Sequence, residues 1–102
     1  MAGLAETYGY IEEHRDAMAA ALQRVVRQPS ISSTGEGVRD CANLLVKLMG
    51  ERGIEARVME TDGLPVVFGR IASDRPDAKT LVIYTHYDVQ PADPESAWES
   101  PP

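Results

Sequence analysis

The sequence has few of the residues on which several classes of protein depend. It contains one cysteine, Cys41, so no internal disulfide can form, and this is typical of a reducing, cytoplasmic setting. No apolar run is long enough to span a bilayer, and no basic cluster offsets the net charge of -6. We therefore expect neither a membrane nor a nucleic acid as a partner. The 102 residues suffice for one small domain with a modest core.

Two amphipathic helices are predicted in the first half of the chain. Residues 8–27 place their larger apolar side chains on one face at helical spacing. A second helix is expected to begin near Ser33, whose spacing to Glu36 is that of a capping box, and to run to about Arg52. The apolar stripe of this helix contains Cys41, which we interpret as a buried, inert thiol.

Three strands are predicted after the helices. Residues 54–60 alternate between apolar and polar side chains, which indicates a half-exposed strand. The turn residues at 61–63 predict a hairpin into a second strand at 66–72. The third strand, 80–85, contains the apolar run 81–84 and is typical of a strand buried on both faces. The predicted fold class is therefore α/β, in the order helix-helix-strand-strand-strand.

The third strand leads directly into two residues suited to a metal site. His86 and Asp88 are two positions apart, so in an extended chain both side chains point to the same face. An imidazole offers a neutral nitrogen ligand, and a nearby carboxylate can fix its tautomer and orientation. A lone His-x-Asp at a strand end is nevertheless more often a hydrogen-bonded turn. The other histidine, His14, is expected on a solvated helix face.

A longer string around the pair favours the metal site. Residues 85–94 read Thr-His-Tyr-Asp-Val-Gln-Pro-Ala-Asp-Pro, and residues 98–102 read Trp-Glu-Ser-Pro-Pro. Together they resemble the metal-site segment of the superfamily of carnosine dipeptidases, aminoacylases, acetylornithine deacetylase and succinyl-diaminopimelate desuccinylase. The dipeptidase branch is the most similar, although Thr85 stands where that branch usually has glycine. In element order, the resemblance covers the whole chain.

The resemblance implies a fold, a cofactor and roles for the two residues. Residues 1–102 would be the N-terminal part of an α/β/α layered metallopeptidase catalytic domain with a mixed sheet, the rest of the domain being absent. The full-length enzyme would hold two Zn²⁺ ions, with Mn²⁺ or Co²⁺ as alternatives. His86 would bind one metal, and Asp88 would act in the catalytic site by orienting His86. The remaining ligands and the general base would lie beyond residue 102.

The implied function is metal-dependent hydrolysis of a peptide bond in dipeptides or short peptides by the full-length enzyme. The chain alone is expected to be an inactive fragment, because a catalytic zinc normally takes three protein ligands. Two alternatives stay open: a deacylase acting on N-acyl amino acids, and a non-catalytic truncated module. Carboxypeptidase activity and a homodimeric full-length enzyme are also compatible with the resemblance. Since the two helices can cover only one face of the third strand, the isolated chain is expected to aggregate or stay partly folded.

Overall fold

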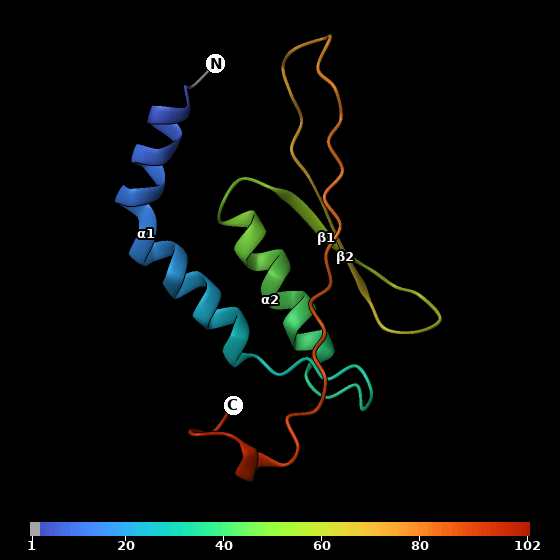
Figure 1. Ribbon diagram of the computed structural model, residues 1–102. Helices are drawn as coiled ribbons and strands as arrows, with labels where there is room; N and C mark the ends of the chain where they lie inside the picture. The colour runs from blue at the N-terminus through green and yellow to red at the C-terminus, as the bar shows by residue number, and fades with distance from the viewer. Residues whose placement is uncertain (1–2) are drawn as a thin grey trace.

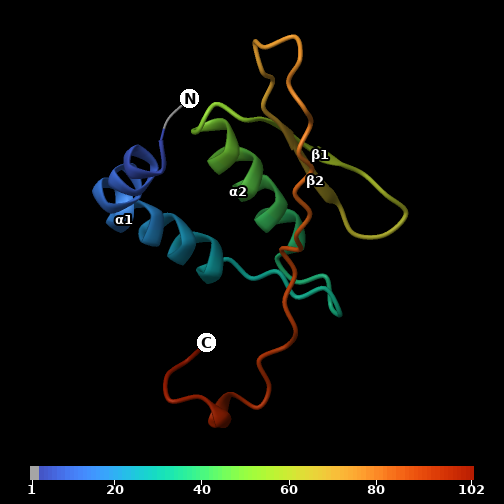
Figure 2. The same ribbon diagram turned by 45° about the horizontal axis from the view of Figure 1, so that its top comes forward.

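The computed structural model describes residues 3–102 and has two helices that lie side by side and run in opposite directions (Figures 1 and 2). Helix α1 spans Leu4–Arg27 and helix α2 spans Val38–Gly50. They are followed by strands β1 (Glu55–Met59) and β2 (Val66–Arg70) and by a short 3-10 helix, η1 (Glu95–Ala97). The predicted α/β class is confirmed, and α1 begins four residues earlier than the apolar pattern indicated. No helix in residues 3–102 combines the length and the apolar character needed to cross a bilayer.

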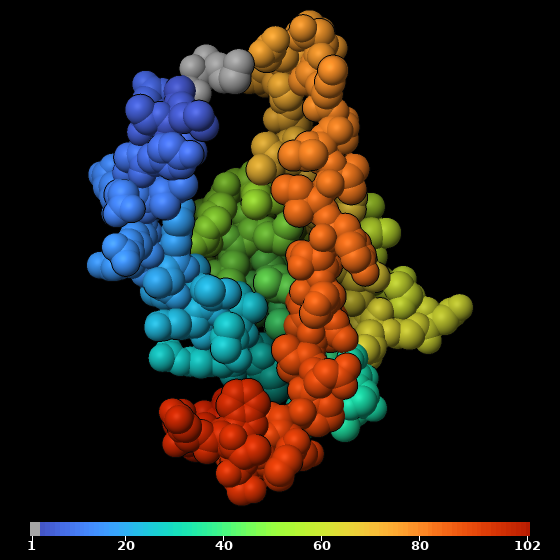
Figure 3. Space-filling model, in the orientation of Figure 1, coloured from blue at the N-terminus to red at the C-terminus, as the bar shows by residue number. Residues whose placement is uncertain are grey.

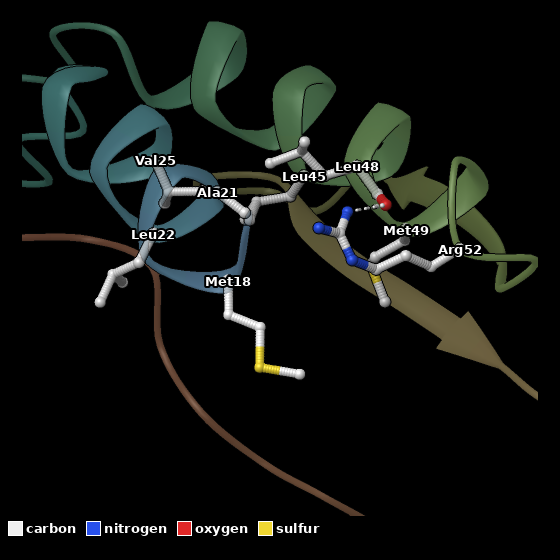
Figure 4. Close-up of a pocket in the computed structure, with 8 residues that line it drawn as sticks. All are labelled: Met18, Ala21, Leu22, Val25, Leu45, Leu48, Met49 and Arg52. Atoms are coloured by element: carbon white, nitrogen blue, oxygen red, sulfur yellow. Dashed lines mark hydrogen bonds between the residues drawn. The ribbon is translucent and has the colours of Figure 1, made fainter. Parts of the chain in front are cut away.

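Helix α1 is largely exposed to solvent. The Gly3 N–H donates to Oε2 of Glu6 (3.1 Å) at its start, and no residue of α1 is buried. Its C-terminal half lies against α2, and the two helices border an apolar hollow of about 290 Å³ (Figure 4). The hollow is lined by Met18, Ala21, Leu22, Val25, Leu45, Leu48, Met49 and Arg52. The described chain therefore leaves apolar side chains of both helices in contact with solvent.

The small core lies along α2, where the described part of the chain buries Val38, Cys41, Ala42 and Leu48. The prediction that this helix begins near Ser33 with a capping box is wrong. Its N-cap is Gly37, in the left-handed region at φ 69°, and no side chain caps it. The reason is tertiary: a Cβ at position 37 would overlap the carbonyl group of Pro29. Residues 31–36 instead close a tight turn, in which the Ile31 N–H donates to the Glu36 carbonyl oxygen (2.9 Å). The helix also ends slightly before the expected Arg52.

The hairpin forms as the turn chemistry predicts. Strands β1 and β2 pair antiparallel with Val58 opposite Val67, and alternate residues of each strand are half-buried against α2. In the connecting turn, Thr61 Oγ1 donates to the Leu64 carbonyl oxygen (2.8 Å), and the Gly63 N–H donates to Thr61 Oγ1 (3.0 Å). Strand β2 ends at Arg70, two residues before the predicted end, because no further ladder bond forms.

The third predicted strand is not formed in residues 3–102. The segment 80–85 is extended, but the sheet of the described residues contains β1 and β2 alone, so it is antiparallel and not mixed. The side chains of residues 81–84 are 81–91% exposed instead of buried, and Figure 3 shows this stretch on the surface of the molecule. A strand needs a neighbouring strand to complete its hydrogen bonds, and no strand of the described chain pairs with this segment.

Candidate metal centre

The segment that carries the predicted site lies across the loop before α2, and the side chain of Tyr87 ties it to the start of β2. The phenolic hydroxyl of Tyr87 donates to the Pro65 carbonyl oxygen just before β2, and the side chain is half-buried. Burial is also the main reason that the pKa of Tyr87 lies above its usual value. Because side chains alternate along an extended chain, an inward Tyr87 directs His86 and Asp88 outward together.

The structure brings His86 and Asp88 into direct contact. Nδ1 of His86 lies 3.1 Å from Oδ1 of Asp88 and 3.0 Å from the Asp88 backbone carbonyl oxygen. Both partners are acceptors when the carboxyl is ionised, so the proton of a neutral ring is held on Nδ1. The lone pair is then on Nε2, and a neutral imidazole nitrogen with a free lone pair can bind a metal. The His86 side chain is 77% exposed, so this nitrogen is accessible.

The Asp88 carboxyl is held in its ionised form by its surroundings. Its pKa lies below the ordinary value, first because the side chain of Ser32 donates a hydrogen bond to it. Partial burial opposes this shift, while the Asp88 backbone and His86 add to it. Ser32 belongs to the loop between the helices, and nothing in its local sequence pattern indicates this role.

A second serine of the same loop holds the backbone of the site. Ser30 is 3% exposed, and its Oγ donates to the Tyr87 carbonyl oxygen (2.8 Å). Its own carbonyl oxygen accepts from the Val89 N–H (2.9 Å), next to a parallel bridge between Ile31 and Val89. Ser30 and Tyr87 are 57 positions apart in the chain, so no sequence spacing could have identified this contact.

The other candidate residues lie outside this site. His14 stacks on Tyr10 with ring centroids 3.9 Å apart, and its Nδ1 lies 2.8 Å from the Tyr10 carbonyl oxygen. Cys41 is fully buried, and burial raises the pKa of its thiol, as an inert core cysteine requires. Near the C-terminal end, Trp98 Nε1 donates to the Ala92 carbonyl oxygen (2.9 Å) and closes the last loop.

The donor set of the described chain fits one ligand position of a metal site. Within residues 3–102, no three His, Cys, Asp or Glu side chains are grouped closely enough to hold an ion. His86 alone presents an accessible nitrogen with its opposite nitrogen fixed by a carboxylate. A catalytic zinc site takes about three protein ligands, so further ligands would have to come from outside this segment.

The chain is similar to metallopeptidases over most of its length, although no family model matches it. It is 35% identical over 109 aligned residues to the Cys-Gly metallodipeptidase DUG1 of Candida albicans. This alignment covers 90% of this chain and 22% of that protein. It is 33% identical over 112 residues to the Cys-Gly metallodipeptidase dug1 of Schizosaccharomyces pombe, covering 97% of this chain and 23% of that protein. The chain thus spans less than a quarter of the length of these two curated relatives.

A solved structure gives the same result for the fold. The chain matches an M20 family metallo-carboxypeptidase, Sso-CP2 from Sulfolobus solfataricus, with a TM-score of 0.71 and 42% sequence identity. The match covers 80% of this chain and 19% of that protein. The sequence comparison and the fold comparison therefore both match the chain to part of a metallopeptidase.

Proposed function

The chain shares its fold and much of its sequence with part of the M20 metallopeptidases, and on that premise we propose that it belongs to a metal-dependent hydrolase of short peptides. Residues 1–102 would form the N-terminal part of the catalytic domain. The observation that carries the proposal is the contact between His86 Nδ1 and Asp88, which leaves His86 Nε2 available within the resembled motif.

In the proposed site, His86 would hold one metal through Nε2. When bound, a divalent ion would lower the pKa of a water ligand and polarise the scissile carbonyl. Imidazole nitrogen suits zinc, so we take Zn²⁺ as the ion, two per full-length enzyme, with Mn²⁺ or Co²⁺ as alternatives. The other ligands and the general base would come from the rest of the protein.

Asp88 would act through His86. By accepting from Nδ1, its carboxylate keeps the proton off the metal-facing nitrogen and makes the ring a stronger donor. The pKa of Asp88 lies below its ordinary value, chiefly through Ser32, so the carboxyl is an acceptor for Nδ1 at neutral pH. Loss of such a partner typically costs about 10- to 100-fold in metal affinity or activity.

Dipeptides are the proposed substrates, because two of the matched relatives are named Cys-Gly metallodipeptidases. The solved relative is named a metallo-carboxypeptidase, which supports cleavage near a free carboxyl terminus. Deacylation of N-acyl amino acids and a non-catalytic module have no comparable support. The buried, unpaired Cys41 is compatible with action in the cytoplasm.

The test uses the full-length protein and three variants. His86→Ala should lose bound metal and Cys-Gly hydrolysis, and Asp88→Asn should keep most of the metal while losing much of the rate. His14→Ala is the matched control, because His14 stacks on Tyr10 in α1 and belongs to no group of potential metal ligands within residues 3–102. Metal is measured by mass spectrometry, and turnover is compared on Cys-Gly and on N-acyl amino acids. Normal metal content in His86→Ala would exclude His86 as a ligand.

A further inference from the structure

Ser30 makes a pair of contacts that the metal site itself does not explain. It is the one buried polar side chain recorded among residues 3–102, and it comes from the loop between α1 and α2. Its hydroxyl donates to the carbonyl oxygen of Tyr87, and its carbonyl oxygen accepts from the N–H of Val89. The two bonded residues are the immediate neighbours of Asp88.

These two contacts fix the peptide planes on both sides of Asp88. The plane before it carries the Tyr87 carbonyl, which is held by Ser30 Oγ at 2.8 Å. The plane after it carries the Val89 N–H, which is held by the Ser30 carbonyl oxygen at 2.9 Å. Since each peptide unit is planar, holding both planes restricts both backbone dihedrals of Asp88. The same second plane carries the Asp88 carbonyl oxygen, which lies 3.0 Å from His86 Nδ1.

Ser30 can impose this geometry because its own loop is held by backbone hydrogen bonds and by a close backbone contact. The turn is closed by the Ile31–Glu36 hydrogen bond, and the Gly35 N–H donates to the Ile31 carbonyl oxygen (2.8 Å). Gly37 approaches the Pro29 carbonyl so closely that a Cβ would not fit. Ser30 itself is 3% exposed, so its side chain lies inside the folded chain. The serine is thus fixed to the core, while His86 and Asp88 face solvent.

We propose that Ser30 is a positioning residue for the metal site. It holds the backbone on both sides of Asp88, so that the carboxylate and the carbonyl of Asp88 both face Nδ1 of His86. Through this contact it sets the tautomer and the direction of the His86 ring. The inference rests on the proposed function, and it adds a residue of the inter-helix loop to the site.

The first readout is the tautomer of His86 in the metal-free, full-length protein. Nitrogen-15 NMR of the ring at about pH 8.5, where histidine is ordinarily neutral, should show the proton on Nδ1 in the wild type. The His86→Ala variant identifies the signal by its disappearance. In Ser30→Ala, the Asp88 backbone is released on one side, and the population with the proton on Nε2 should rise. Ser33→Ala, an exposed serine of the same loop, should leave the wild-type spectrum unchanged.

The second readout is the dissociation constant for Zn²⁺ alone, measured by competition with a chelator. Ser30→Ala should weaken binding by about 3- to 10-fold, as expected from the loss of one neutral hydrogen bond. Ser30→Cys replaces the hydroxyl with a slightly larger and weaker donor, so under reducing conditions its zinc affinity should fall between those of Ser30→Ala and the wild type. It also serves as the test variant if Ser30→Ala does not fold.

The outcomes separate this inference from the proposed function. If His86→Ala binds zinc normally, the proposed function fails. If His86→Ala loses zinc but the Ser30 variants keep the wild-type tautomer and affinity, the positioning role alone is overturned. A lower melting temperature in Ser30→Ala with an unchanged tautomer and affinity would likewise reduce Ser30 to a structural residue.

Discussion

Gly37→Ala is the substitution that should disturb both the fold and the site. Gly37 is the N-cap of α2 and has a φ of 69°, in the left-handed region. A Cβ there would overlap the carbonyl oxygen and carbon of Pro29, which are backbone atoms and cannot move aside as a flexible side chain would. The loop that carries Ser30 would therefore have to shift.

The expected cost has two parts. An L-residue in the left-handed region costs about 1–2 kcal/mol. The overlap with Pro29 adds strain comparable to overpacking a core, about 1–3 kcal/mol. The sum of roughly 2–5 kcal/mol is a large share of a typical stability of about 5–15 kcal/mol. Gly35→Ala separates the parts, because Gly35 has a φ of 78° and open space where its Cβ would lie.

The assay compares the unfolding and zinc affinity of full-length variants. Gly37→Ala should unfold at a lower urea concentration than Gly35→Ala and should bind zinc more weakly than the wild type. Gly53→Ala is a second control, because Gly53 has a φ of 74° and open space beyond the other end of α2. It should lose stability but keep its zinc affinity. Equal stability of Gly37→Ala and Gly35→Ala would refute the role of the Pro29 contact.

Two further predictions concern the isolated chain, and a third concerns an exposed ion pair in the full-length protein. Residues 1–102 alone should bind zinc weakly and hydrolyse no dipeptide; tight one-to-one binding in calorimetry would contradict this, because His86 fills one ligand position. The chain alone should aggregate through residues 81–84, whose side chains are 81–91% exposed. Burying a large apolar side chain stabilises a protein by about 1.5–3 kcal/mol, so association through this segment is favourable. Light scattering should fall when Val82 and Ile83 are both changed to lysine, and a monomeric, cooperatively melting wild-type chain would refute the explanation. Arg39 donates two hydrogen bonds of 2.7 Å to the carboxylate of Glu60 and thereby lowers the pKa of Glu60. The stability that this exposed pair contributes is therefore present above the ordinary carboxyl pKa and is lost as the pH falls through the lowered pKa of Glu60. The melting temperatures of wild type and Arg39→Ala in the full-length protein should therefore converge in acid; a constant gap down to about pH 2 would argue against the ion pair.

Local patterns predicted the parts of the fold that depend on near neighbours. The alternation at 54–60 and the turn residues at 61–63 were enough to place the hairpin, because its turn is closed by Thr61 and Gly63 themselves. The alternation of side chains along an extended chain also predicted that His86 and Asp88 lie on one face, and Nδ1 of His86 lies 3.1 Å from Oδ1 of Asp88. Their role in binding metal stays a prediction.

Contacts between distant segments could not be predicted in this way. The predicted start of α2 was wrong because the helix begins after Gly37 and not at a local capping box. Glycine is needed at position 37 because any side chain would overlap the carbonyl group of Pro29, eight positions earlier. The apolar run 81–84 indicated a buried strand, but the sequence does not say which strand would pair with it. Ser30 lies in the loop between the two helices, and only the folded chain shows its hydrogen bond to Tyr87.

The most direct test of the metal site is the crystal structure of the full-length protein grown with zinc, with anomalous diffraction recorded at the zinc edge. The account predicts a zinc peak about 2.0–2.1 Å from His86 Nε2, with Nδ1 still facing Asp88. Zinc bound with His86 outside its coordination sphere, or bound through Nδ1 with Asp88 displaced, would contradict it.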